Sequence, residues 1–427
     1  MAIRERSATM CCRRRRWPQP DHDARSPTVT TTTTPAQPTD LPTILYFGND
    51  WMAENRTSSH HVARWLAKRY RVIYVESPGL RAPKGTGRDI KKLFNKVALA
   101  LRGPRPQPEG LSVQTLLQVP LHRFSIVRAA NRHLMLATLK LLMRARGIAK
   151  PITWFVVPHL ASVAGALGEE LSVYYCIDDY ASLPDVDPQA VRAMDDSLTT
   201  KADIVFVASG TLLEGKRALN ANTHVSPHGV DYDHFVKAQD PALATPADIA
   251  NLPRPLIGFF GLIERWIELD LVAYLARERP SWSFLMIGRV AIPDADVPKL
   301  PNLHFIGRRP YDALPAYGKA FTAAIIPYHL TPQVINSNPI KLREYLAMGK
   351  PIVAVSIPEI DKFKDYVAIA RTKEEFLVAL DRAVVDGLTL EQVRRQTELA
   401  ATMTWDANLK RVMAVVEKQL SEKRGRS

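Results

Sequence analysis

The sequence has few cysteines, no long apolar run and, in one region, almost no acidic residues. The three cysteines are Cys11, Cys12 and Cys176. Three isolated thiols make no disulfide framework and show no metal-ligand spacing, so we expect a reducing, cytosolic setting and no metal site. No apolar run reaches the roughly 18 to 20 residues that a transmembrane helix requires. The first residues include arginines but no apolar stretch behind them, which is not the pattern of a secretory signal.

Acidic residues are scarce between residues 61 and 150. This region holds 19 Lys and Arg residues against three acids, Glu76, Asp89 and Glu109, and so accounts for the whole net charge of +14. A basic face confined to one region indicates an anionic surface or ligand. Membrane headgroups, a lipid-linked pyrophosphate acceptor and nucleic acid are the candidates. The chain has no zinc-finger spacing and no aromatic RNA-binding motif, so we expect no nucleic-acid partner.

Residues 84–102 are the clearest candidate for a membrane contact within the basic region. Apolar residues recur there at spacings of three and four, and Lys91, Lys92 and Lys96 fall between them. A basic amphipathic helix is typical of membrane-surface binding, although a core-packed helix with solvated lysines has the same pattern. We expect a peripheral protein on the cytoplasmic face of the inner membrane. A second helical stretch spans 134–143.

Short apolar runs that alternate with helical stretches fill most of the chain. Its 427 residues, 46% hydrophobic and 23% charged, are enough for two globular domains. Strand–helix–strand alternation predicts parallel sheets with right-handed crossovers, an α/β fold. A small-residue stretch at 161–167 predicts a further helix. The predicted strands are 43–47, 71–75, 152–157, 172–177, 204–209, 256–260, 284–288, 303–307, 323–328 and 352–355.

Two carboxylates follow one of these strands. Asp178 and Asp179 come directly after the run 172–177. Ligands of parallel sheets bind beyond the carboxyl ends of the strands, so the pair lies where catalysis is expected. Because neighbouring residues of a strand point to opposite faces, we expect only one of the two to face the ligand and the other to cap the next turn. As weaker catalytic candidates the sequence offers three histidines, each with a structural or capping role as the alternative: His60, His61 and His159.

The stretch 336–353 carries a complete helix signature. Asn338 is a good N-cap, and Pro339 suits the first turn, where a missing N–H costs nothing. Gly349 then ends the helix, and a proline follows two residues later. An apolar strand comes next. We therefore expect a helix whose N-terminus lies close to the start of this stretch.

That helix start has the chemistry to bind a nucleotide sugar. Free N–H groups from Ser337 to Ile340 favour an anion such as a phosphate, and Lys341 adds a full positive charge beside them. Glu344 lies one turn further on, where a carboxylate can accept hydrogen bonds from sugar hydroxyls. The alternative is an ordinary capped helix with Lys341 and Glu344 on a solvated face.

This stretch is similar to the sugar-nucleotide helix of the GT-B fold glycosyltransferases, and residues 227–235 resemble the segment that ends their first domain. The resemblance covers about 41–420. It implies that Lys341 contacts the donor diphosphate and that Glu344 holds the donor ribose, with Asn338 at the helix start. Many retaining members carry a Glu where this chain has Asn336, so the stereochemical outcome stays open.

The resemblance assigns roles to residues outside the helix as well. The turn at Gly261 would face the donor phosphates, with Arg265 as a possible phosphate partner. Loops at Arg289 and Tyr328 would approach the base and the sugar. A last helix would cross back onto the first domain, with Trp405 packed at the crossing. If the enzyme inverts the anomeric centre, Asp178 or Asp179 would be its general base.

Together the resemblance implies two doubly wound Rossmann-like domains that face each other across a cleft. The expected parts are a disordered basic, Thr-rich extension (1–40), an acceptor-binding domain with a basic membrane-facing insertion (41–236), a linker (237–255), a nucleotide-sugar-binding domain (256–403) and the returning helix (404–427).

The expected activity is the metal-independent transfer of a sugar from a nucleoside diphosphate sugar, expected to be a UDP-sugar, with no cofactor. The acceptor would be lipid-linked or a glycan of the cell envelope or an exopolysaccharide. With its residues 258–266 and the Asp178–Asp179 strand end, the chain looks most like bacterial enzymes that make exopolysaccharide, teichuronic acid or related envelope glycans, and the xanthan glucuronosyltransferases are a group nearby. Two alternatives remain: a nucleotide-sugar epimerase on the same fold, and a non-catalytic membrane adaptor. The basic acceptor domain argues against the first, and Lys341 with Glu344 against the second.

Overall fold

The structure is a computed structural model that describes residues 42–52, 57–76, 103–116 and 125–426. The predicted extension at 1–40 and the predicted basic helix at 84–102 lie outside these residues. No helix among the described residues is long and apolar enough to cross a membrane.

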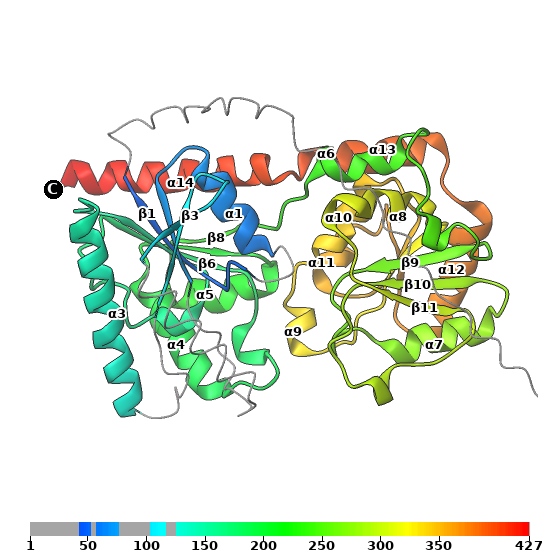
Figure 1. The fold of residues 1–427 in the computed structure, drawn as a ribbon, viewed down its shortest axis with the longest axis horizontal. Coiled ribbons are helices and arrows are strands. Elements are labelled where there is room, and N and C mark those ends of the chain that lie inside the picture. The colour runs from blue at the N-terminus through cyan, green and yellow to red at the C-terminus, as the bar shows by residue number, and fades with distance from the viewer. Residues whose placement is uncertain (1–41, 53–56, 77–102, 117–124, 427) are drawn as a thin grey trace, which may run out of the picture. The chain divides into compact units, whose positions relative to one another are not determined.

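The first half of the described chain builds an eight-stranded sheet in the order β3-β4-β2-β1-β5-β6-β7-β8. Figure 1 labels β1, β3, β6 and β8 of this sheet. Neighbouring strands of this sheet run parallel to each other, except that the short strand β3 is antiparallel to β4. The order reverses between β1 and β5, as in a doubly wound sheet. The strands are β1 (Ile44–Gly48), β2 (Val72–Glu76), β3 (Arg105–Pro106), β4 (Ser112–Thr115), β5 (Ile152–Phe155), β6 (Leu171–Cys176), β7 (Ile204–Val207) and β8 (Thr223–Val225).

A second sheet of six parallel strands follows, in the order β11-β10-β9-β12-β13-β14. Here the order reverses between β9 and β12. Ligands of doubly wound sheets bind at such a reversal, beyond the carboxyl ends of the strands. The strands are β9 (Leu256–Phe260), β10 (Ser283–Ile287), β11 (Leu303–Gly307), β12 (Ala323–Ile326), β13 (Ile352–Val355) and β14 (Ala368–Ala370).

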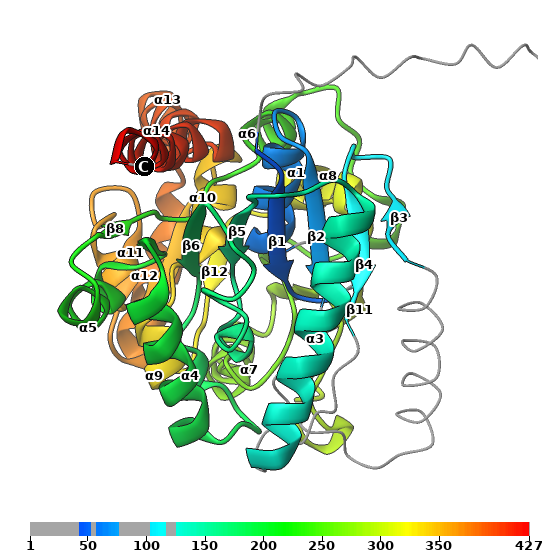
Figure 2. The same cartoon turned by 90° about the vertical axis from the view of Figure 1, so that its left-hand side faces the viewer.

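Helices cover both faces of the first sheet because its strands are apolar on both sides. Ile44 and Tyr46 of β1 belong to one buried cluster, whereas Leu45 and Phe47 belong to the other. The first cluster includes residues of α1 (Ser58–Ala67) and of α14 (Trp405–Arg426), the last helix of the chain. The second includes residues of α3 (Ser125–Ala145) and α4 (Pro188–Lys201), and Figure 2 shows α3 running along the strands.

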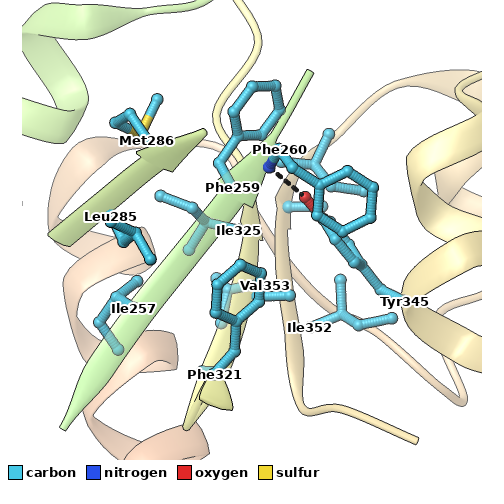
Figure 3. Close-up of a cluster of buried hydrophobic side chains, with 14 of the residues drawn as sticks. Ile257, Phe259, Phe260, Leu285, Met286, Phe321, Ile325, Tyr345, Ile352 and Val353 are labelled. Carbon is cyan, nitrogen blue, oxygen red and sulfur yellow. Dashed lines mark hydrogen bonds between the residues drawn. The ribbon is translucent and has the colours of Figure 1, made fainter. Parts of the chain in front are cut away.

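The second sheet has an aromatic core of its own. Phe259 and Phe260 of β9 pack with residues of the neighbouring strands and with Tyr345, as Figure 3 shows. The Phe260 N–H donates to the Tyr345 hydroxyl oxygen over 3.1 Å, which fixes the helix of Tyr345 against the end of β9. The helices of this half are α7 (Leu269–Glu278), α8 (Leu314–Ala320), α9 (Pro332–Ile335), α10 (Ile340–Ala347), α11 (Pro358–Asp361), α12 (Lys373–Asp386) and α13 (Leu390–Thr402).

The α/β prediction is confirmed, and all ten predicted strands are present. The helix predicted at 161–167 is wrong, because this segment consists of turns after a short 3-10 helix at Pro158–Leu160. Gly165 has a φ of +80° there, a left-handed conformation that ends helical hydrogen bonding. Trp405 is buried in the cluster of the first sheet. The domain boundaries stay a prediction.

Candidate functional site

Helix α10 begins one residue later than its sequence predicts. Its N-cap is Pro339, and the predicted cap Asn338 makes no capping bond. The Asn338 side chain is fully engaged elsewhere: its Oδ1 accepts from the His228 N–H (3.3 Å), and its Nδ2 donates to Glu359 (2.9 Å). The cap prediction was wrong because these long-range partners compete with the local capping bond. As a result, the first-turn N–H groups of α10 receive no side-chain cap.

Lys341 and Glu344 form an ion pair on this helix. The Lys341 Nζ lies 2.6 Å from the Glu344 Oε2 and 4.6 Å from the centroid of the Phe260 ring. Glu344 is buried, while the Lys341 side chain is partly exposed. The pair therefore sits beside the carboxyl end of β9, at the point where the strand order reverses. A lysine there can pair with an incoming anion, and the carboxylate can then accept from hydroxyl groups.

Two glycine turns complete this edge of the second sheet. Gly261 follows β9 and donates its N–H to the Ile287 carbonyl (2.9 Å), which brings it against the end of β10. A Cβ on Gly288 would lie 1.7 Å from the Gly261 carbonyl oxygen, so no larger residue fits. A Cβ on Gly261 would lie 3.4 Å from Lys341 Cε. The structure thus brings Gly261 and Lys341 together, and an anion would meet backbone and ammonium at one place.

The other predicted donor residues lie around this edge at varying depth. Tyr328 follows β12, and burial raises its pKa, with a further contribution from the Glu344 carboxylate. Ser337 donates from its hydroxyl to the Val334 carbonyl (2.7 Å). Arg265 and Arg289 are both exposed. The carbonyl of Arg289 accepts from the backbone of the segment after Gly261.

Ile340 differs from its neighbours on α10, because it faces the other half of the chain. Its side chain packs against the buried cluster of the first sheet, together with Ile177. It therefore acts as a packing residue at the start of α10, and what it offers a donor is its backbone N–H.

The carboxylates of Asp178 and Asp179 both reach side chains of the second half. Gln333 donates to the Asp178 Oδ2 (3.3 Å), and Asn336 donates to the Asp179 Oδ2 (2.9 Å). The Ser182 hydroxyl donates to the same Asp179 oxygen (2.6 Å). Burial raises the pKa of Asp178 to about 6, and the hydrogen bond from Gln333 opposes that rise. A carboxylate with such a pKa is suited to take up a proton near neutral pH.

Asp179 directly precedes the 3-10 helix Tyr180–Ser182 and accepts from Ser182, as expected of the carboxylate at the next turn, but both carboxylates also accept from side chains of the second half. The strand β6 ends at Cys176, so both residues lie in the loop beyond it and the alternation of a strand does not apply to them. Their partners lie in helix α9 (Gln333) and directly after it (Asn336), more than 150 residues later in the chain. Sequence reasoning located the pair but had no signal for these partners.

The three candidate histidines have separate surroundings. The His60 Nδ1 accepts from the Thr57 N–H (3.1 Å) at the start of α1, which is a capping role. The His61 ring stacks on Trp405, with 5.1 Å between ring centroids. His159 is buried in the 3-10 helix that follows β5. His159 also lines a cavity.

That cavity, of about 450 Å³, lies between α3 and α4 on the first sheet. Its wall combines apolar side chains with cations; it includes Ala129, Arg132, Met135, His159, Met194 and Lys201. Among the described residues, no group of three or more His, Cys, Asp or Glu residues could hold a metal ion. The wall suits a ligand that carries both apolar and anionic parts.

Glu359 is a buried carboxylate that sequence reasoning missed. Its Oε1 accepts from the Gly210 N–H of the first half (2.7 Å), and its Oε2 accepts from Asn338 (2.9 Å). The Ser209 hydroxyl donates to the Asn336 carbonyl close by (2.6 Å). These bonds tie the loop after β7 to the start of α10. No local pattern predicts them, because the partners are between 21 and 149 residues apart in the chain.

Comparisons with known proteins agree with this architecture. No protein-family model matches the chain. The chain is 23% identical over 399 residues to a Bacillus subtilis (strain 168) protein named "Putative teichuronic acid biosynthesis glycosyltransferase TuaH", and the match covers 86% of this chain and 94% of the relative.

Solved structures of low sequence identity share the fold. An E. coli trehalose-6-phosphate protein bound with UDP-2-fluoro glucose has a TM-score of 0.61 at 11% identity and covers 87% of this chain and 98% of its own. Anabaena HepE in complex with UDP and glucose has a TM-score of 0.59 at 14% identity, with coverages of 88% and 99%. The sucrose-phosphate synthase of Thermosynechococcus elongatus has a TM-score of 0.61 at 12% identity, with coverages of 89% and 100%. The chain has the GT-B fold, and its resemblance to glycosyltransferases of that fold is confirmed.

Proposed function

We propose that this GT-B chain is a glycosyltransferase that moves a sugar from a UDP-sugar to an acceptor hydroxyl held by the first half. The observation that carries the proposal is the position of Lys341, beside the Gly261 turn at the reversal of the second sheet. An ammonium group, uncapped helix N–H groups and a close backbone turn together suit a diphosphate. The complexes of HepE with UDP and with UDP-glucose support uridine as the nucleoside.

The donor would lie along the edge formed by the glycine turns and α10. Its diphosphate would face the α10 N-terminus and displace Glu344 from the Lys341 ammonium. The freed carboxylate of Glu344 would accept hydrogen bonds from the ribose hydroxyls. Tyr328 and Arg289 would border the sugar and base, and Arg265 would approach a phosphate from the surface. Ser337, Asn338 and Ile340 would shape the helix start.

Transfer requires a base for the acceptor and charge stabilisation for the leaving group. We assign the base to the Asp178–Asp179 pair and favour Asp178, since burial raises its pKa to about 6. The acceptor hydroxyl gives its proton to this carboxylate, its oxygen bonds to the anomeric carbon, and the bond from that carbon to the phosphate oxygen breaks. Lys341 and the start of α10 stabilise the charge on the departing UDP. This route inverts the anomeric centre.

The acceptor, its place in the cell and the domain boundaries belong to the proposal as well. The cavity between α3 and α4 suits a lipid-linked acceptor, which has an apolar part and an anionic part. The teichuronic acid name of the Bacillus subtilis relative supports a role in the synthesis of an envelope glycan. We place the chain at the cytoplasmic membrane face because its acceptor would be lipid-linked. Residues 41–236 would be the acceptor domain, 237–255 the linker, 256–403 the donor domain, and 404–427 the returning helix.

The test is product analysis with a panel of UDP-sugars, with and without a membrane lipid extract as the acceptor source. We expect UDP release that depends on the extract, together with a labelled sugar in the lipid fraction. Conversion of the donor to an isomeric UDP-sugar without acceptor would replace the proposal by an epimerase. Donor binding without release of UDP under any condition would replace it by a non-catalytic adaptor.

A further inference from the structure

The outward side of α3 is unusually apolar for a solvent-facing helix surface. Its inward residues Met135 and Leu139 are buried in the core of the first sheet. On the outward side, Ile126 is 82% exposed, Leu134 44% and Leu141 68%. Spacings of eight and seven residues place these three side chains along one stripe of the helix.

Only basic charge accompanies this stripe. The 21 residues of α3 include no acidic residue. Lys140 and Arg144 are exposed on the same side of the helix as Leu141. Among the ion pairs of the described residues, none involves Lys140 or Arg144. Their charges therefore remain uncompensated within the part of the chain that the structure describes.

Helix α12 offers an internal comparison. It also exposes two apolar residues seven positions apart, Val378 (51%) and Val385 (81%). Its sequence, however, mixes acidic and basic residues, including Glu374 and Asp381. Single exposed apolar residues on such a surface are ordinary. A stripe accompanied by cations alone is the pattern of helices that lie on anionic lipid surfaces.

We propose that the outward side of α3 binds the anionic headgroup surface of a lipid bilayer. Ile126 and Leu141 would enter the boundary between headgroups and acyl chains, and Lys140 and Arg144 would pair with lipid phosphates. Nucleic acid phosphates would match the cations but leave the aliphatic stripe without a partner. Arg132 of the same helix lines the cavity between α3 and α4. A bilayer on α3 would therefore deliver a lipid beside that cavity.

This inference rests on the proposed function, because a lipid-linked acceptor is the reason for such an enzyme to dock on a membrane. It is separable from the predicted helix at 84–102, whose lysines the test leaves unchanged. The donor edge lies in the second half, so membrane binding and donor binding fail independently.

The experiment is co-sedimentation of the full chain with vesicles of phosphatidylcholine alone or mixed with phosphatidylglycerol. We expect binding that requires phosphatidylglycerol. Lys140→Glu with Arg144→Glu should weaken it by about tenfold or more, since each basic residue near the surface contributes several-fold. Ile126→Ser with Leu141→Ser should weaken it at high salt as well, where the charge attraction is screened. The matched control is Val378→Ser with Val385→Ser, which should leave binding unchanged.

Each variant is also tested for stabilisation by UDP. Retained UDP stabilisation with lost vesicle binding supports the inference and shows that the variant is folded. Undiminished vesicle binding by both α3 variants would overturn it, as would binding of the wild type to a DNA duplex but not to the vesicles. If UDP did not stabilise the wild type, this result would contradict the proposed function, and the vesicle result would still hold.

Discussion

The two sheets end in different chemistry at their carboxyl edges. The second ends in two glycine turns and the Lys341–Glu344 pair, which contact one another within the same half. The first ends in Asp178 and Asp179, whose carboxylates accept hydrogen bonds from the opposite half. The proposed donor edge is thus complete by itself. The proposed base, by contrast, is positioned only while the two halves are in contact, so binding and chemistry should be separable by mutation.

Replacing the base should have the largest effect and should leave the donor edge intact. We expect Asp178→Asn to lower kcat by about 1,000-fold or more, because the acceptor hydroxyl loses its proton acceptor. Stabilisation by UDP should be unchanged. The control is Asp233→Asn, which alters an exposed carboxylate and should keep full activity. If Asp179→Asn abolishes transfer while Asp178→Asn does not, the base is Asp179.

Lys341→Ala should disable the donor edge itself. The expected loss in kcat/KM is about 100- to 1,000-fold, the effect of removing one group that stabilises the leaving charge. UDP should also bind more weakly, in contrast to Asp178→Asn. Lys410→Ala removes an exposed ion pair with Asp406 and serves as the control. Turnover near that of the wild type in Lys341→Ala would reject the assignment of the donor site.

Gly288→Ala should disrupt the donor edge by a steric clash with the Gly261 turn. The new Cβ would meet the Gly261 carbonyl oxygen, and a φ of +152° is unfavourable for alanine. We expect a loss of about 2–3 kcal/mol in the free energy of unfolding, measured by denaturant titration, together with weakened UDP binding. In Gly215→Ala the added methyl group meets no neighbour, and this helix position should keep or gain stability. Equal stability of the two variants would contradict the tight turn.

Removing the contact from Gln333 should shift the pH dependence of transfer. The acid limb of the kcat profile should have an apparent pKa near 6 in the wild type, since transfer requires the deprotonated Asp178. The hydrogen bond from Gln333 lowers that pKa, so Gln333→Ala should move the limb to higher pH. We expect a loss of a few-fold at pH 6 and little change at pH 8. An unshifted limb would mean that Asp178 is not the titrating group.

The smallest effect concerns stability. Because the folded pKa of Asp178 is raised, the folded state holds more protons than the unfolded state between about pH 4 and pH 6. The stability that the protonated Asp178 carboxyl contributes is present below pH 4 and is lost as the pH rises through 6. Asp178→Asn should therefore raise Tm by about 2–4 °C at pH 7, on the order of 1 kcal/mol after allowing for solvent screening, and by nothing at pH 4. A rise of equal size at both pH values would contradict this origin.

The comparison also explains what the sequence could and could not predict. The strands, the glycine turns and the spacing of Lys341 and Glu344 follow from local pattern, and the structure brings Gly261 and Lys341 together as the resemblance implied. Asn338 was assigned as a cap because capping is a local property, but Glu359 and His228 bind its side chain instead. Glu359 and His228 lie outside the helix pattern around Asn338, so that pattern does not indicate these contacts.

Distant partners also determine the site in the first half. Asp178 and Asp179 were located by the strand before them, whereas their orientation depends on a loop and on Gln333 and Asn336. Of α3, only the stretch 134–143 was predicted as a helix, so neither Ile126 nor the exposure of the outward side was predicted. Strand β4 escaped prediction because Ser112–Thr115 has only one aliphatic residue, although it pairs with β2 along its whole length.

The central claim is that the edge at Gly261 and Lys341 binds a nucleoside diphosphate. Thermal unfolding of the wild type and of Lys341→Ala with UDP, GDP and ADP tests it most directly. We expect UDP to stabilise the wild type by about 2.7 kcal/mol at 100 times its Kd, and we expect Lys341→Ala to lose most of this stabilisation. If no nucleotide stabilises the wild type, or if UDP stabilises both proteins equally, the donor site does not lie at this edge.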